Sequence, residues 1–128
     1  MAVQTTPQTI TLIASANFSA LTMGRFVEFL SAAGLTLCRD TQRADGVLNT
    51  FPAASFAAAV IVGAGKVRVE SGAAVTVGAL VASDISGRAV PSTVYAGEVI
   101  LGRALSAAGA AGEEITILYF GNGGGGTD

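Results

Sequence analysis

Apolar and polar residues alternate along several short runs of this chain, and glycines and turn residues separate the runs. The clearest run is Lys66–Glu70, where Val67 and Val69 alternate with charged side chains. A period of two places successive side chains on opposite faces of a β-strand, so we expect both valines to be buried and Lys66, Arg68 and Glu70 to face water. The same pattern occurs at Thr9–Leu12, Leu35–Leu37 and Glu114–Tyr119.

Sustained helical periodicity is missing. Asn17–Met23 offers one helical turn at most, with Asn17 as its N-cap, and Ala53–Ala59 favours a loop that leads into the β-branched run Val60–Val62. The chain has 17 glycines, many of them in turn contexts between the strand runs. Short strands with many tight corners predict a compact, all-β fold with little helix.

A weak internal repeat runs through these strands at an offset of about 54 to 57 residues. Apolar strands and small-residue turns recur in the same order: Arg25–Val27 with Leu80–Ala82, Leu35 with Ala89–Val90, Gly46–Leu48 with Gly102–Leu105, and Val60–Val62 with Ile115–Ile117. Neither unit has enough core to be stable alone. The repeat therefore predicts two similar β units that pack their apolar faces together. The residues expected in this core are Val67, Val69, Leu80, Val81, Leu101, Ile115 and Ile117.

The length of 128 residues fits one domain at 15–120, preceded by an arm or first strand at 1–14 and followed by a flexible glycine-rich tail at 121–128. The role of Thr9, Ile10, Thr11 and Leu12 has two alternatives. As an arm, the segment would add a strand to a neighbouring subunit or to a capsid protein, with Ile10 and Leu12 in shallow pockets. Alternatively, it is the first strand of its own sheet.

The charge content limits the possible functions. Only 12% of the residues are charged, so we expect part of the protein's surface to be covered by copies of the chain or by a larger assembly. The net charge is −2 and the basic residues are scattered, which argues against direct nucleic-acid binding. The chain has no histidine, which excludes histidine-dependent catalytic and zinc sites. A single cysteine, Cys38, cannot form an internal disulfide, and no uncharged stretch is apolar enough to span a membrane.

Three patterns that suggest chemistry fail on inspection. Gly63–Lys66 lacks the first glycine and the hydroxyl residue of a phosphate loop, so it is expected to be a bend between two strands. Asp40, Asp45 and Asp84 stand in turn contexts, where aspartate accepts backbone N–H bonds. The only lysine, Lys66, begins an alternating strand and therefore does not resemble the hairpin-tip lysine of a lipoyl or biotin carrier. We expect no catalytic residue, metal or cofactor.

The order of small-residue motifs resembles the capsid cement and head decoration proteins of tailed phages. The resemblance covers about Phe18 to Leu118 and rests on Phe26–Leu30, Gly46–Asn49, Pro52–Ala54, Gly65–Val75, Gly78–Asp84, Gly87–Pro91, Val99–Leu105 and Ala110–Ile115. It implies a non-enzymatic virion protein on the outer surface of the capsid, made in the host cytoplasm, with a β-clip or β-tulip fold. It also implies the major capsid protein and two further copies of the chain, in a homotrimer, as partners. The alternative is a head-fibre base or adhesion module mounted on the capsid.

Overall fold

The computed structural model describes residues 9–14, 17–31, 34–38, 44–53, 56–92 and 99–121, and this part of the chain contains strands and turns but no helix. The strands are β1 (Thr9–Ile13), β2 (Arg25–Ser31), β3 (Gly34–Leu37), β4 (Gly46–Leu48), β5 (Ala57–Ile61), β6 (Gly65–Glu70), β7 (Leu80–Ser83), β8 (Ala89–Pro91), β9 (Gly102–Ala104) and β10 (Glu114–Tyr119). The all-β prediction is confirmed. The predictions for residues 1–8 and 122–128 lie outside the described residues.

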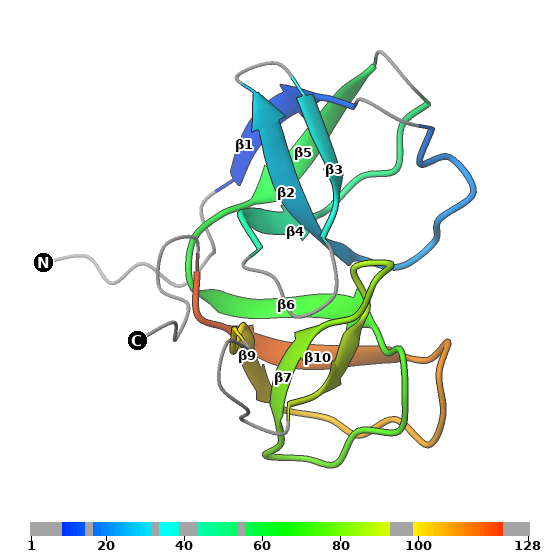
Figure 1. Cartoon of the computed structure of the whole chain (residues 1–128), viewed down its shortest axis with the longest axis vertical. Coiled ribbons are helices and arrows are strands. Elements are labelled where there is room, and N and C mark those ends of the chain that lie inside the picture. Colours follow the sequence, from blue (N-terminus) through cyan, green and yellow to red (C-terminus); the bar gives the residue numbers. More distant parts are fainter. Residues whose placement is uncertain are drawn as a thin grey trace, which may run out of the picture.

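The strands form two five-stranded sheets, one above the other in Figure 1. The order is β1-β5-β4-β2-β3 in the first sheet and β6-β10-β9-β7-β8 in the second. Each strand of the second sheet thus takes the place of the strand five earlier in the chain. The predicted repeat is confirmed, and it extends to β1 and β6, which the sequence comparison had not paired. The two units are called the first half and the second half below.

One glycine in each half occupies the same place in its sheet. Gly46 pairs with Val27 across β4 and β2, and Gly102 pairs with Val81 across β9 and β7. A Cβ on Gly46 would lie 2.9 Å from the carbonyl oxygen of Ile61, and one on Gly102 would lie 2.5 Å from that of Leu118. Both sites are too close to the neighbouring strand for any side chain, which explains why a glycine begins each of these strands.

Each sheet also curls until its two edge strands meet at one end. Ala14, directly after β1, forms a parallel bridge with Leu35 of β3, and Ser71, directly after β6, forms the same bridge with Ala89 of β8. Backbone bonds repeat as well: Ala14 N–H donates to Phe56 O, and Ser71 N–H donates to Glu113 O. The repeat therefore extends from strand order to individual hydrogen bonds.

The apolar residues form two cores. A smaller one lies inside the first half and contains Ala14, Phe18, Val27, Leu35, Leu48, Ala58 and Val60. The larger one lies inside the second half and continues into the first through Phe26, Cys38, Ala44 and Val47. Six of the seven predicted core residues are buried. Leu80 is the exception, being half-buried at the start of β7.

Two further predictions need correction. Asn17 starts a turn rather than a helix: its Oδ1 accepts the Ser19 N–H at 2.9 Å, and Phe18 O accepts the Leu21 N–H. Glu70, expected in water, has a side chain only 15% exposed because it pairs with Arg25 from the other half. Val67 and Val69 are buried, and Lys66 and Arg68 are exposed, as the alternation predicted.

Candidate assembly surface

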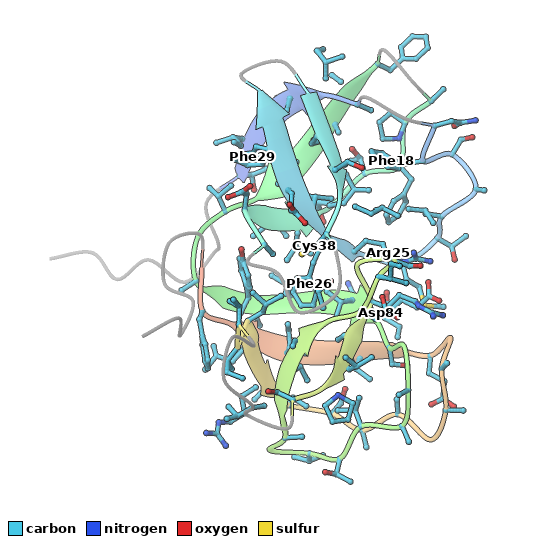
Figure 2. All side chains as sticks on the ribbon, viewed as in Figure 1. Phe18, Arg25, Phe26, Phe29, Cys38 and Asp84 are labelled. Atoms are coloured by element: carbon cyan, nitrogen blue, oxygen red, sulfur yellow. The ribbon has the colours of Figure 1, made fainter. Side chains whose placement is uncertain are left out.

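The two halves meet along a joint whose centre is apolar. Successive residues of a strand face opposite sides, so Val27 and Leu48 point into the first-half core while Phe26 and Val47 point out of it. Phe26 packs against Tyr119 of β10, with ring centroids 6.3 Å apart. Figure 2 shows Phe26 and Cys38 between the two sheets. The joint therefore buries what would otherwise be an exposed apolar face of the first half.

Cys38 is fully buried in this joint. Burial raises the pKa of its thiol from 9.0 to about 12, against a smaller opposing effect of a hydrogen bond with Ser83. The thiol is therefore protonated at neutral pH, which makes it a poor nucleophile. Cys38 therefore acts as a small apolar core residue.

A charged network closes one margin of the joint. Arg25 donates to Glu70 Oε1 from Nη2 at 2.7 Å and from Nε at 3.2 Å, and donates to Ser86 O from Nη1 at 3.0 Å. Arg88 lies 3.8 Å from Glu70 Oε2 and donates to Asp84 Oδ2 at 3.0 Å. Figure 2 shows Arg25 and Asp84 close together at the right-hand side of the molecule. The pairs tie β2 to β6 and to the β7–β8 turn.

Backbone bonds complete the joint. Gly24 O accepts the Glu70 N–H at 2.9 Å, and Gly87 O accepts the Phe26 N–H at 2.8 Å. A Cβ on Gly24 would clash with the carbonyl oxygen of Arg68. The chain before β2 thus lies directly against the outer edge of β6.

A groove of about 540 Å³ follows the same line between the halves. Its first-half wall includes Leu48, Phe51 and Ile61, and its second-half wall includes Lys66 and Glu114. A second groove, of about 470 Å³, lies where Phe18 and Leu21 approach Ile85. Besides apolar side chains, the first groove is lined by Lys66 and by the ion pair of Arg68 and Glu114, whose charged atoms are 3.9 Å apart.

The predicted site residues Thr9, Ile10, Thr11 and Leu12 lie in β1, which pairs antiparallel with β5 of the same sheet. The segment is therefore the first strand of its own sheet, and the expectation that these residues leave the domain as an arm is wrong. Ile10 and Leu12 pack, half-buried, against the first-half core, while Thr9 and Thr11 are exposed on the other face. They reach the core because β5, which is distant in the sequence, pairs with β1 along its whole length. A contact of these residues with a neighbouring subunit or a capsid protein stays a prediction.

Before the Ala14–Leu35 bridge to β3, the outer edge of β1 nevertheless pairs with no described strand. Ala14 N–H points toward β5, so the alternation of an antiparallel ladder directs the N–H groups of Thr9, Thr11 and Ile13 away from β5. No described residue accepts them. Ile13 is also 41% exposed, and Phe56 beside it is 64% exposed. An open strand edge next to exposed apolar side chains is a typical place for association.

The patterns that suggested chemistry are structural. Asp84 Oδ1 accepts the N–H groups of Ser86 and Arg88 and so stabilises the turn between β7 and β8. Asp45, directly before β4, accepts the N–H of Phe29 in β2 through Oδ2 at 2.7 Å, so its carboxylate links two strands rather than a turn. Residues 62–64 connect β5 to β6, as the bend prediction required, and Asp40 lies outside the described residues. Within the described ranges no three histidine, cysteine or acidic side chains gather as a metal site. The described part has no helix long and apolar enough to cross a membrane.

The fold is similar to that of known solved structures. The chain is similar to the crystal structure of the head fiber gp8.5 N base in bacteriophage phi29, with a TM-score of 0.72 and 17% sequence identity. The similarity covers 89% of this chain and 94% of that one. No protein-family model matches the chain, and no curated protein matches it either. At this identity the likeness shows a shared fold.

Proposed function

We propose that this chain is a non-enzymatic structural protein of a phage head, bound as a cement or decoration subunit to the outer surface of the capsid. The observation that carries the proposal is the fold likeness to a phage head-fibre base along almost the whole of both chains. The order of motifs from Phe18 to Leu118, which resembles phage cement proteins, is an independent support. The major capsid protein is the proposed partner, and a homotrimer is the proposed assembly.

The composition fits a protein that works inside a large array. With 12% charged residues, the chain has few groups that oppose association. Many weak contacts repeated over a symmetric shell give high avidity without one strong site. A cement subunit therefore needs broad, mostly uncharged faces, which this chain offers at the β1 edge.

The second candidate is a base that anchors a head fibre. The similar solved structure is itself a head-fibre base, which favours this candidate directly. A base and a cement subunit share the capsid as a partner but differ in what their removal changes. Cement resists the pressure of packaged DNA, whereas a fibre base only carries an appendage.

Purified phage particles separate these functions. We expect the chain in particles at several hundred copies, and we expect particles that lack it to release DNA at a lower temperature than intact ones. A few dozen copies, with unchanged thermal release of DNA, would favour the fibre base. Absence of the chain from particles that are otherwise complete would contradict both functions.

A further inference from the structure

The joint between the two halves uses a different face of each half. The first half contributes the β2 face, formed by Gly24, Arg25 and Phe26, and the second half contributes the β6 face, formed by Arg68, Glu70 and Tyr119. Because the halves repeat each other, each face has a counterpart in the other half. If the halves were related by a two-fold axis, the counterparts would meet as well.

The sheet registers identify the counterparts. Val27 pairs with Gly46 and Val81 pairs with the equivalent Gly102, so Val27 and Val81 correspond. The three residues before each valine therefore correspond as well. The counterpart of the β2 face is thus the β7 face, formed by Gly78, Ala79 and Leu80. Ala14 and Ser71 take the same bridge, so Ile13 corresponds to Glu70 and Thr11 to Arg68. Extending the β4–β5 register by one residue matches Val62 to Tyr119. The counterpart of the β6 face is therefore the β1 face: Thr11, Ile13 and Val62.

These counterparts do not meet within the chain. Gly24 O accepts the N–H of Glu70, but Gly78 O accepts Arg103 Nη1 at 2.8 Å, and no described residue accepts the N–H of Ile13. A two-fold arrangement would have bonded Ile13 to Gly78. The halves are therefore joined head to tail, which leaves the β1 face free at one end of the molecule and the β7 face free at the other.

The free faces match each other in chemistry. At the internal joint, Arg25 pairs with Glu70; their counterparts, Ala79 and Ile13, are both apolar. Both members of the ion pair are replaced together, so no charge is left without a partner. Similarly, the aromatic pair Phe26 and Tyr119 is replaced by Leu80 and Val62.

Both free faces remain partly accessible, although Val62 and Ala79 also pack against the cores of their own halves. Ile13 is 41% exposed, while Val62, Ala79 and Leu80 are half-buried. The correspondence explains why Leu80 departs from the predicted core, since the equivalent Phe26 is buried in a core that includes the second half. The β7 face and the β1 face are thus two partly uncovered surfaces that repeat the geometry of a joint already present in the molecule.

We propose that the β7 face of one copy docks on the β1 face of the next copy and repeats the internal joint between chains. Ile13 N–H then donates to Gly78 O of the neighbour, whose second lone pair remains available to Arg103. Leu80 packs against Val62, and Ala79 lies over Ile13. A head-to-tail contact of this kind closes into a ring or continues as a filament. In a closed trimer, six similar halves would alternate between internal and intermolecular joints.

Cross-linking between two separately made variants tests the pairing. Full-length Ile13→Cys and Ala79→Cys chains are mixed at high concentration with a short bismaleimide, with Ile85→Cys as the matched control because Ile85 is 77% exposed but belongs to neither face. The proposal predicts a product between Ile13→Cys and Ala79→Cys chains and none with Ile85→Cys. The buried Cys38 should leave the unaltered chain unlinked.

Two results would overturn the proposal: no mixed product at any concentration, or a product from Ile13→Cys alone, which indicates a two-fold contact. A chain with both Ile13→Cys and Ala79→Cys then reports closure, because a ring stops at a fixed size and a filament gives a ladder. This test needs only the purified chain. A negative result would therefore overturn the contact between copies but not the proposed attachment to phage heads, which is tested on particles.

A charge exchange tests the residue matching. Ile13→Glu should weaken self-association about tenfold or more, since it buries an unpaired carboxylate. Adding Ala79→Arg should restore it by recreating the Arg25–Glu70 pair between copies. Sedimentation at several concentrations measures both effects, and equal melting temperatures show that the variants fold. Unchanged association in the folded Ile13→Glu chain, or no recovery in the folded double variant, would contradict the matching.

Discussion

The two halves have the same strand order, the same glycine at the same register and the same closing bridge, yet their edge strands have different surroundings. The edge of β6 is covered where Gly24 O accepts the Glu70 N–H, whereas no described residue accepts the N–H of the equivalent Ile13 in β1. The difference follows from the head-to-tail joint and from a few side chains: Glu70 meets Arg25, while the equivalent Ile13 remains partly exposed. A repeated fold therefore does not imply a repeated surface.

The cores differ in the same way. The second-half core continues through the joint to Phe26 and Cys38, whereas the first-half core is separate and is bordered by the half-buried Ile10 and Leu12 of β1. We therefore expect the second half to be the more sensitive to loss of apolar volume.

The largest expected effect is at Ile117, a fully buried residue in the centre of the second half. Ile117→Ala should lower the free energy of unfolding by about 2–5 kcal/mol through lost burial and the cavity left behind. Leu12→Ala on the open edge should cost about half as much or less, because Leu12 is already half-buried. Urea unfolding measures both, and equal losses would show that the edge is as enclosed as the centre.

The equivalent glycines should be equally intolerant. Gly102→Ala and Gly46→Ala each place a Cβ against a neighbouring strand, and we expect a loss of about 1–3 kcal/mol for each. Gly109→Ala is the control, because its Cβ would make an ordinary 3.6 Å contact with Glu113. Thermal unfolding of the three variants measures these losses. A loss of stability in only one of the two strand-glycine variants would contradict the equivalence of the two positions.

The buried thiol predicts a pH dependence. The pKa of Cys38 is raised from 9.0 to about 12 in the folded chain, so folding favours the protonated form. Its contribution to stability is complete below about pH 9 and is lost progressively as pH rises toward 12, on the order of 2 kcal/mol by pH 10.5. The drop in unfolding free energy between pH 8 and pH 10.5 should be correspondingly smaller in Cys38→Ala. Identical drops in both proteins would show that the thiol is not buried in the joint.

The smallest effect concerns two ion pairs in different surroundings. A double-mutant cycle on Arg25 and Glu70, whose side chains are 12% and 15% exposed, should give a coupling of about 1–2 kcal/mol. The same cycle on Arg68 and Glu114, which are 74% and 41% exposed and 3.9 Å apart, should give less than about 0.5 kcal/mol. Similar couplings would mean that the joint does not shield its charges.

Much of this fold could be predicted from local sequence patterns. Alternation placed Val67, Val69, Ile115 and Ile117 in a core, and recurring glycines revealed the repeat. The misses depend on distant contacts. Glu70 looks solvated until Arg25, 45 residues away, is brought beside it, and Leu80 looks like core although it is only half-buried. The open edge of β1 could not be predicted, since it depends on how the two halves pack: the first half covers the edge of β6, but the described part of the second half does not cover the edge of β1.

Amide hydrogen exchange, resolved by residue, tests the head-to-tail arrangement most directly. In the dilute chain, the account predicts a slow Glu70 amide, which donates to Gly24 O, and a fast amide at the equivalent Ile13. At concentrations that favour assembly, the Ile13 amide should slow toward that of Glu70 while other amides of the β1 edge follow. An Ile13 amide as protected as that of Glu70 in the dilute monomer would contradict the account, because both edges would then be covered within one chain.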